Sequence, residues 1–296
     1  MHEGPDGIRW QVIGASVTGA AHRRVGAERQ DAIAFWPPRG RAGRTAVLTV
    51  SDGHGSPRHF RSAVGAKLAV EVALTVLLAY VRDAAAPPQD VAHLPERLVQ
   101  AWRDAVASHA AAHPFTASEW RVLQDLTSPD AQDEIERSPA IAYGATLLAV
   151  AVRDASLVYL QLGDGDILSV DHAGETTRVL PGDPRLVGNQ TTSLCQPDAA
   201  ECFRVRLAED EGALPSLVLV ATDGYANAFR SDDDFRLIGR DYFTLLREHG
   251  LERTAARLDR FLTDASANGS GDDITLGLMT HSEVVTRPRP RSRDVW

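Results

Sequence analysis

The order of apolar and polar positions along the chain predicts strands at both ends and helices between them. Short apolar or alternating runs rich in β-branched residues, the pattern of β-strands, occupy 10–18, 32–36, 45–50, 145–152, 157–162, 166–170, 176–180, 202–207, 217–221 and 274–279. Apolar residues recur at helical spacing in 58–82, 94–113, 235–248 and 251–265. This order favours an α+β fold, a central antiparallel β-sandwich flanked by helix pairs.

The same pattern predicts one folded domain over residues 10–281, preceded by an N-terminal segment, 1–9. Within the domain, 114–139 has a proline near each end and an acidic run, and we interpret it as a helical or irregular insertion. The Arg- and Pro-rich tail, 282–296, has too little apolar content to pack, so we expect it to be disordered.

Composition narrows the function classes. The 296 residues are 44% hydrophobic, enough for a substantial core, and the net charge of −9 argues against a nucleic-acid-binding surface. Residues 1–9 contain no basic segment leading into an apolar stretch, and we find no run of about 18 apolar residues. We therefore expect a cytoplasmic monomer without membrane association. Cys195 and Cys202 lack metal-ligand spacing and are predicted to be free thiols.

Four short motifs place an aspartate beside a predicted strand. They are Arg29-Gln30-Asp31, Ser51-Asp52-Gly53-His54-Gly55, Thr222-Asp223-Gly224 and Gly271-Asp272-Asp273-Ile274-Thr275. A single Asp-Gly is more often only a turn, but strand ends of a sandwich can converge. Crowded carboxylates repel one another unless a cation neutralises them. An all-oxygen ligand set selects a hard ion, so we expect Mg²⁺ or Mn²⁺ rather than Zn²⁺.

Two residues inside the second motif suggest further chemistry. Gly53 lets the backbone approach an ion and offers its own carbonyl as a ligand. His54, placed beside the ions, is a candidate to protonate a leaving oxygen near neutral pH.

Together with Tyr143-Gly144-Ala145-Thr146 and Gly163-Asp164-Gly165-Asp166, these motifs resemble, in order over about residues 10–280, the metal-dependent protein phosphatase 2C (PPM) family of Ser/Thr phosphatases. The resemblance implies an α-β-β-α sandwich with a two-metal site between its sheets. It also implies, as activity, hydrolysis of phosphoserine or phosphothreonine by in-line attack of a hydroxide bridging two ions. The substrate would be a phosphorylated protein, and the enzyme would oppose a Ser/Thr kinase.

The resemblance also assigns residues. Asp52, Asp223 and Asp272 match the carboxylate ligands of one metal, and Asp52 with the Gly53 carbonyl matches those of the other. Asp31 matches the residue that contacts metal-bound water, His54 the general acid, and Asp164 a position that helps to hold a third, weaker ion. Residues 184–198 lie where the family carries its flap.

Three positions depart from the family pattern. Gln30 replaces an acidic residue, and Gly26 stands where many members have a phosphate-binding arginine, so Arg23, Arg24 and Arg29 become the candidates for that role. Asn227 replaces a carboxylate of the third metal site, which should then be weaker or absent.

These departures keep two alternatives open. One is a catalytically weak or inactive module that binds a phosphoprotein or a regulatory partner. The other, a metal-dependent nuclease or nucleotide phosphohydrolase, is disfavoured by the acidic charge and by the lack of an aromatic, basic platform.

Overall fold

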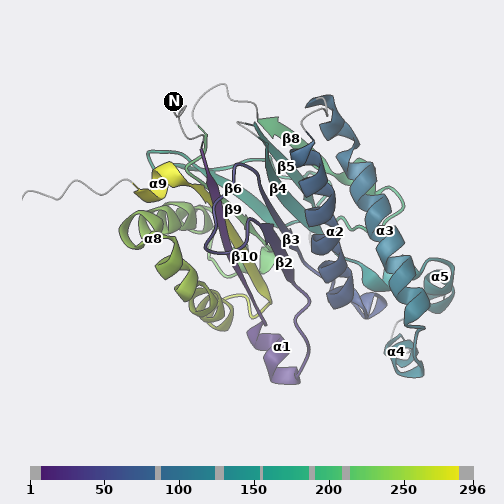
Figure 1. The fold of residues 1–296 in the computed structure, drawn as a ribbon. Coiled ribbons are helices and arrows are strands. Elements are labelled where there is room, and N and C mark those ends of the chain that lie inside the picture. Colours follow the sequence, from purple (N-terminus) through teal and green to yellow (C-terminus); the bar gives the residue numbers. More distant parts are fainter. Residues whose placement is uncertain are drawn as a thin grey trace, which may run out of the picture.

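The computed structural model describes residues 8–83, 88–123, 130–153, 156–186, 191–208 and 214–286. Within them, two five-stranded antiparallel sheets pack face to face (Figure 1). The first sheet has the order β1 (Trp10–Val17), β10 (Ile274–His281), β9 (Leu217–Ala221), β6 (Asp166–Val170) and β7 (Thr176–Arg178). The second has the order β2 (Ala32–Trp36), β3 (Ala46–Ser51), β4 (Leu147–Arg153), β5 (Ser156–Leu162) and β8 (Arg204–Ala208). The predicted α+β sandwich is confirmed.

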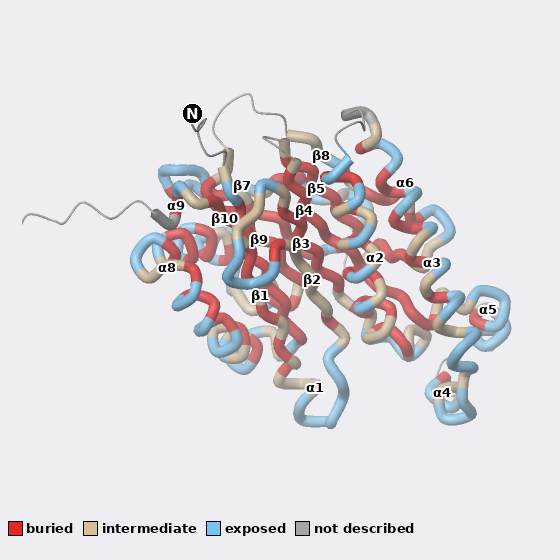
Figure 2. The backbone as a smooth tube through the Cα atoms, in the orientation of Figure 1, coloured by how far each residue is buried: buried red, intermediate tan, exposed pale blue. Residues whose placement is uncertain are grey.

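The central strands are continuous apolar runs because both of their faces are covered. In β3, Leu48 and Val50 belong to the cluster of side chains between the sheets, whereas Val47 belongs to the cluster on the helical side. Figure 2 shows this buried interior running through the central strands, with most of the exposed residues on helix surfaces and loops.

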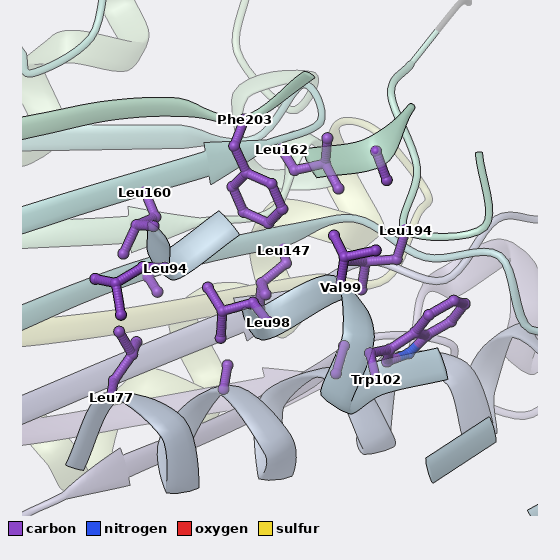
Figure 3. Close-up of a cluster of buried hydrophobic side chains, with 14 of the residues drawn as sticks. Leu77, Leu94, Leu98, Val99, Trp102, Leu147, Leu160, Leu162, Leu194 and Phe203 are labelled. Carbon is purple, nitrogen blue, oxygen red and sulfur yellow. The ribbon is translucent and has the colours of Figure 1, made fainter. Parts of the chain in front are cut away.

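Helices cover the outer faces of both sheets (Figure 1). The helices α2 (Ser62–Arg82) and α3 (Leu94–Ala112) pack on the second sheet, and α8 (Asp232–Asn268) packs on the first. Figure 3 shows Leu77 of α2, Leu98 and Trp102 of α3, and Leu147 and Leu160 of the sheet within one buried cluster.

The composition of α2 follows from this position. Among the described helices, α2 alone is long and apolar enough to cross a membrane by length and composition. Lys67 and Glu71 interrupt its apolar sequence. Its Ala66, Ala69, Ala73 and Leu77 are all buried, so its apolar side chains form part of the core.

Several element boundaries differ from those expected. A 3-10 turn, η1 (Pro57–His59), precedes α2. The helix therefore begins at Ser62, four residues after the start predicted at residue 58. The strand expected at 176–180 ends at Arg178. The strand expected at 202–207 is β8, which begins at Arg204 because a short helix, α6 (Ala199–Cys202), precedes it. Gly250 (φ 77) breaks α8, which gives the two helices predicted there.

Helices also occur at other places where none was expected. The exposed α1 (Ala20–Val25) follows β1, and α9 (Ser282–Thr286) occupies the start of the segment predicted to be disordered. The rest of that tail, 287–296, and the N-terminal residues 1–7 lie outside the described residues.

The insertion is helical where it is described. It contains α4 (Ala117–Val122) and α5 (Ala131–Arg137) and ends where the 3-10 segment η3 (Pro139–Tyr143) begins, while 124–129 lie outside the described residues. A capping box between Thr116 and Glu119 starts α4. The guanidinium of Arg61, just before α2, donates to Glu119 at 2.6 and 3.0 Å and to the Tyr143 hydroxyl at 2.6 Å. This network ties the insertion to the core.

Candidate metal-dependent active site

Three acidic side chains meet at one end of the sandwich. Asp52 follows β3, Asp164 lies in the turn between β5 and β6, and Asp223 opens α7 (Asp223–Ala226) directly after β9. The antiparallel registers bring these strand ends to the same edge, because the end of β3 pairs with the start of β4, which pairs with the end of β5. Carboxylate oxygens of the three residues lie within 4.8 Å of one another.

The backbone around Asp52 is fixed by the segment that leads into β4. The Asp52 amide donates to Thr146 Oγ1 at 3.0 Å, the Thr146 amide donates to the Asp52 carbonyl at 2.8 Å, and the His54 amide donates to the Gly144 carbonyl at 3.1 Å. A side chain at Gly53 would place its Cβ 2.8 Å from the carbonyl oxygens of Gln30 and Ser62. Only glycine fits there.

Crowding opposes the ionisation of Asp52 and Asp223. Burial, followed by the charges of Asp31 and Asp223, raises the pKa of Asp52 well above its ordinary value. Burial and the charges of Asp164 and Asp272 raise the pKa of Asp223 to about 6. A cation between them removes this repulsion. Because all the donors are oxygens, the residues present fit a hard divalent ion such as Mg²⁺ or Mn²⁺.

Asp31 lies beside this group in a pocket of hydroxyls. It is 4% exposed, and burial raises its pKa to about 7. Thr222 Oγ1 donates to Asp31 Oδ2 at 2.8 Å and accepts from the Thr275 amide at 2.9 Å. The two threonines thus hold the carboxylate in one orientation between β9 and β10.

Asp272 takes a different place from the one expected. It is exposed and is not one of the three closely grouped carboxylates, in which Asp164 stands instead. Asp272 nevertheless lines the same cleft as Asp52, and its charge contributes to the raised pKa of Asp223. Its assignment as a metal ligand stays a prediction.

The neighbouring Asp273 is a residue that the sequence analysis quoted but gave no role. It is 3% exposed and accepts from the amides of Gly19 and Gln30, each at 2.6 Å, and from His22 Nδ1 at 3.0 Å. It therefore holds α1 and the segment before Asp31 against β10. The paired Asp-Asp of the motif was the available signal, since one aspartate can face the cleft while the next faces inward.

His54 lies in the cleft, with its ring 4.9 Å from that of His59 in an edge-to-face arrangement. Burial, and then the charge of His59, lowers the pKa of His54 to about 3, so the imidazole is neutral at neutral pH with these neighbours. Its Nε2 is buried without a hydrogen-bond partner. A phosphate dianion at this atom would favour the protonated ring. The proposed role of His54 as the general acid depends on this protonation.

The third metal site stays a prediction. Asn227 Nδ2 donates to Asp223 Oδ2 at 3.0 Å, so a neutral amide contacts the carboxylate at this position. Asp164, the other residue predicted for this position, is one of the three grouped carboxylates.

None of the three candidate arginines lines the cleft. Arg29 donates to the carbonyls of Asp31 and Ser16 at 3.1 and 2.8 Å, and Arg23 donates to the Thr18 carbonyl at 2.5 Å. Arg24 is exposed on α1. Phosphate binding by these three residues therefore receives no support from their positions.

The cleft measures about 780 Å³ and collects side chains from distant segments. They include His22, Asp52, His54, Arg58, His59, Ser138, Thr191, Ser193, Cys195 and Asp272. The segment predicted as a flap, 184–198, contributes Thr191, Ser193 and Cys195, and its residues 187–190 lie outside the described residues. Cys195 and Cys202 are both free thiols.

Comparison with solved structures identifies the fold. Stp1 from Staphylococcus aureus, a serine/threonine phosphatase, is similar with a TM-score of 0.60 at 13% identity, over 95% of this chain and 98% of that one. The serine/threonine phosphatase PstP/Ppp from Mycobacterium tuberculosis gives 0.54 at 15% identity, over 92% and 98%. A PstP catalytic domain solved with two manganese ions gives 0.55 at 16% identity, over 93% and 99%.

The two sheets, their covering helices and the carboxylate group together define an α-β-β-α sandwich with a candidate metal site at one end. The sequence model of protein phosphatase 2C matches residues 18–263, and the chain therefore belongs to the protein phosphatase 2C family. Comparison with curated protein sequences gave no significant match.

Proposed function

We propose that this protein hydrolyses phosphoserine or phosphothreonine in proteins, with Mg²⁺ or Mn²⁺ as its cofactor. The observation that carries the proposal is the group of Asp52, Asp164 and Asp223, whose oxygens lie within 4.8 Å of one another at the edge of a cleft that also holds His54. The names of the similar solved structures support the choice of phosphorylated Ser or Thr as substrate. We further propose that the enzyme acts as a cytoplasmic monomer and opposes a Ser/Thr kinase.

Each side chain has a defined task in this proposal. Asp52, Asp223 and the Gly53 carbonyl would hold the ions, with Asp164 or Asp272 completing the set. When bound, the ions supply a water of lowered pKa and offset the charge of the phosphate oxygens. Asp31, oriented by Thr222, accepts a hydrogen bond from the attacking water.

His54 serves the leaving group. Its buried Nε2 has no protein partner and is free to donate to the serine or threonine oxygen as the ester bond breaks. Because burial keeps the ring neutral, the substrate's own negative charge must first favour its protonation.

Phosphate release from a phosphothreonine peptide tests the proposal. We expect release in Mn²⁺ or Mg²⁺, none in EDTA, and at least about a hundredfold loss in Asp52→Asn, because a bound metal contributes several kcal/mol of charge stabilisation. Asp259→Asn, an exposed carboxylate on α8, is the matched control and should keep full activity. A phosphotyrosine peptide hydrolysed as fast as the phosphothreonine peptide would contradict the proposed substrate class.

The alternative is a catalytically weak module that binds a phosphoprotein. The hydrogen bond from Asn227 to Asp223 favours it, because it occupies one carboxylate oxygen at the third metal position. Phosphopeptide binding without release by metal-loaded, folded protein would support this alternative.

A further inference from the structure

The cleft needs a positive side chain if it is to hold a phosphate, and the described residues supply one. Among them, Arg58 is the only arginine or lysine that lines the cleft with Asp52 and His54.

Arg58 lies in the cleft because it closely follows the motif at 51–55. It lies in η1, four residues after His54, and its amide is capped by Ser56 Oγ at 3.5 Å. Its charge acts on the cleft wall: burial raises the pKa of Cys195, and the Arg58 charge opposes that rise. The guanidinium therefore lies close to the side chains that face a substrate.

The donors of Arg58 are only partly used. Its Nη2 forms an ion pair with Glu134 of α5, and its Nε is buried without a hydrogen-bond partner. The pair is half exposed, since 40% of the Arg58 side chain and 39% of the Glu134 side chain are accessible. Ion pairs with this exposure are weak, so releasing Glu134 costs little.

We propose that Arg58 binds the phosphate group of the substrate, and that Glu134 holds Arg58 in position until a phosphate displaces it. This inference rests on the proposed function. The planar guanidinium presents a fork of N–H donors that matches two phosphate oxygens. A phosphate dianion carries more charge than the single carboxylate of Glu134, and it offers a partner to the unused Nε.

The proposal also gives the insertion a role. Glu134 comes from α5, within the segment that was predicted only as a helical or irregular insertion. Arg61 and Glu119 anchor this segment to the start of α2, where Arg58 lies. The insertion thereby sets how readily the cleft accepts a phosphate.

Calorimetric binding of inorganic phosphate to the Mn²⁺-loaded protein tests the inference. Arg58→Ala should weaken phosphate binding about 10- to 100-fold, as expected for losing hydrogen bonds to a charged group. Arg58→Lys keeps the charge but not the fork and should fall between Arg58→Ala and wild type. Glu134→Gln should tighten binding up to about fivefold by freeing Arg58. Arg97→Ala, an exposed arginine of α3, is the control and should bind phosphate like wild type.

The readouts separate a binding role from a structural one. The Mn²⁺ affinity and the melting temperature of Arg58→Ala should match those of wild type, while its KM for a phosphothreonine peptide rises. Unchanged phosphate binding in Arg58→Ala, or weaker binding in Glu134→Gln, would overturn the inference. Should Arg58→Ala fail to fold, phosphate binding by Arg58→Lys and Glu134→Gln still tests the inference, since weaker binding is expected in the first variant and tighter binding in the second.

The proposed function is tested separately by wild type alone. A wild type that releases no phosphate from any phosphopeptide refutes the phosphatase. A wild type that releases phosphate while Arg58→Ala binds and hydrolyses equally well refutes only the assignment of Arg58.

Discussion

Asp52 lies where burial and three like charges all oppose its ionisation. A buried, crowded carboxylate lowers the stability of the fold, and such local destabilisation is typical of functional positions. Asp31 and Asp223 share this destabilisation, since burial raises the pKa of both. A bound cation removes this repulsion for the whole group. Metal binding should therefore stabilise the fold at the place where its buried charges destabilise it most.

The variant Asp52→Asn should separate stability from function. Because the folded-state pKa of Asp52 is raised, its contribution to stability is present below the unfolded pKa and is lost as pH rises through the folded one. At neutral pH the metal-free variant should therefore melt no lower than wild type. Wild type should gain about 2.7 kcal/mol from Mn²⁺ at a hundredfold excess over Kd, and the variant much less. Equal Mn²⁺-induced rises in melting temperature would refute the ligand role.

The sequence identified some site residues and missed others for a physical reason. Asp31, Asp52 and His54 belong to local motifs that can be read within a few residues. Arg58 was overlooked although it lies only six residues after Asp52, because its role depends on a cleft completed by distant segments. Glu134 likewise acquires meaning only through its contact with Arg58.

At the scale of elements, the pair of Arg61 and Glu119 fastens α4 to the start of α2. Arg61 is 8% exposed, and its hydrogen bonds are the main cause that lowers the pKa of Glu119 to about 2. A depressed folded-state pKa means that the stabilisation is present above the unfolded pKa and is lost as pH falls through the folded one.

Glu119→Gln should consequently be less stable than wild type by about 1 to 3 kcal/mol at neutral pH. The difference should shrink as pH falls from about 4.5 toward about 2, where wild type loses the charge as well. Urea unfolding of both proteins at neutral pH and near pH 3 measures it. A difference that stays constant across this range would show that the charge of Glu119 contributes nothing.

The close contact between α2 and η3 requires a glycine, which has no side chain, at position 65. A Cβ at Gly65 would lie 1.8 Å from the Tyr143 carbonyl oxygen. Helix propensity alone favours alanine by about 1 kcal/mol, but the clash with backbone should outweigh it. We expect Gly65→Ala to lose about 1 to 3 kcal/mol or more in urea unfolding. Gly182→Ala, where a Cβ meets nothing within 4 Å, is the control, and an equal loss there would discount the clash.

The elements that were predicted well are those with a buried face. The strands β3 and β9 and the helices α2 and α3 pack on the core, so their apolar periodicity is strong. The helix α1 has no buried residue, and its sequence therefore gave no such signal. The strands β7 and β8 lie at sheet edges, where pairing on one side leaves the boundaries weakly specified.

At the scale of the whole molecule, the sandwich explains why residues so far apart in sequence act together. Antiparallel pairing returns each strand to the same edge, so Asp52 of one sheet meets Asp164 and Asp223 there. Figure 1 shows α1 and the α4–α5 segment projecting at one end of the sandwich. The order of elements predicted the two sheets, but the identity of the three closest carboxylates required the strand registers.

The most direct test of the central claim follows metal occupancy and catalysis in one titration. Mn²⁺ is added to metal-free wild type while its binding and its phosphate release from a phosphothreonine peptide are measured together. The account predicts that release rises with occupancy, disappears on addition of EDTA, and is absent from Asp223→Asn at every Mn²⁺ concentration. Full occupancy without release, or release that persists in EDTA, would contradict it.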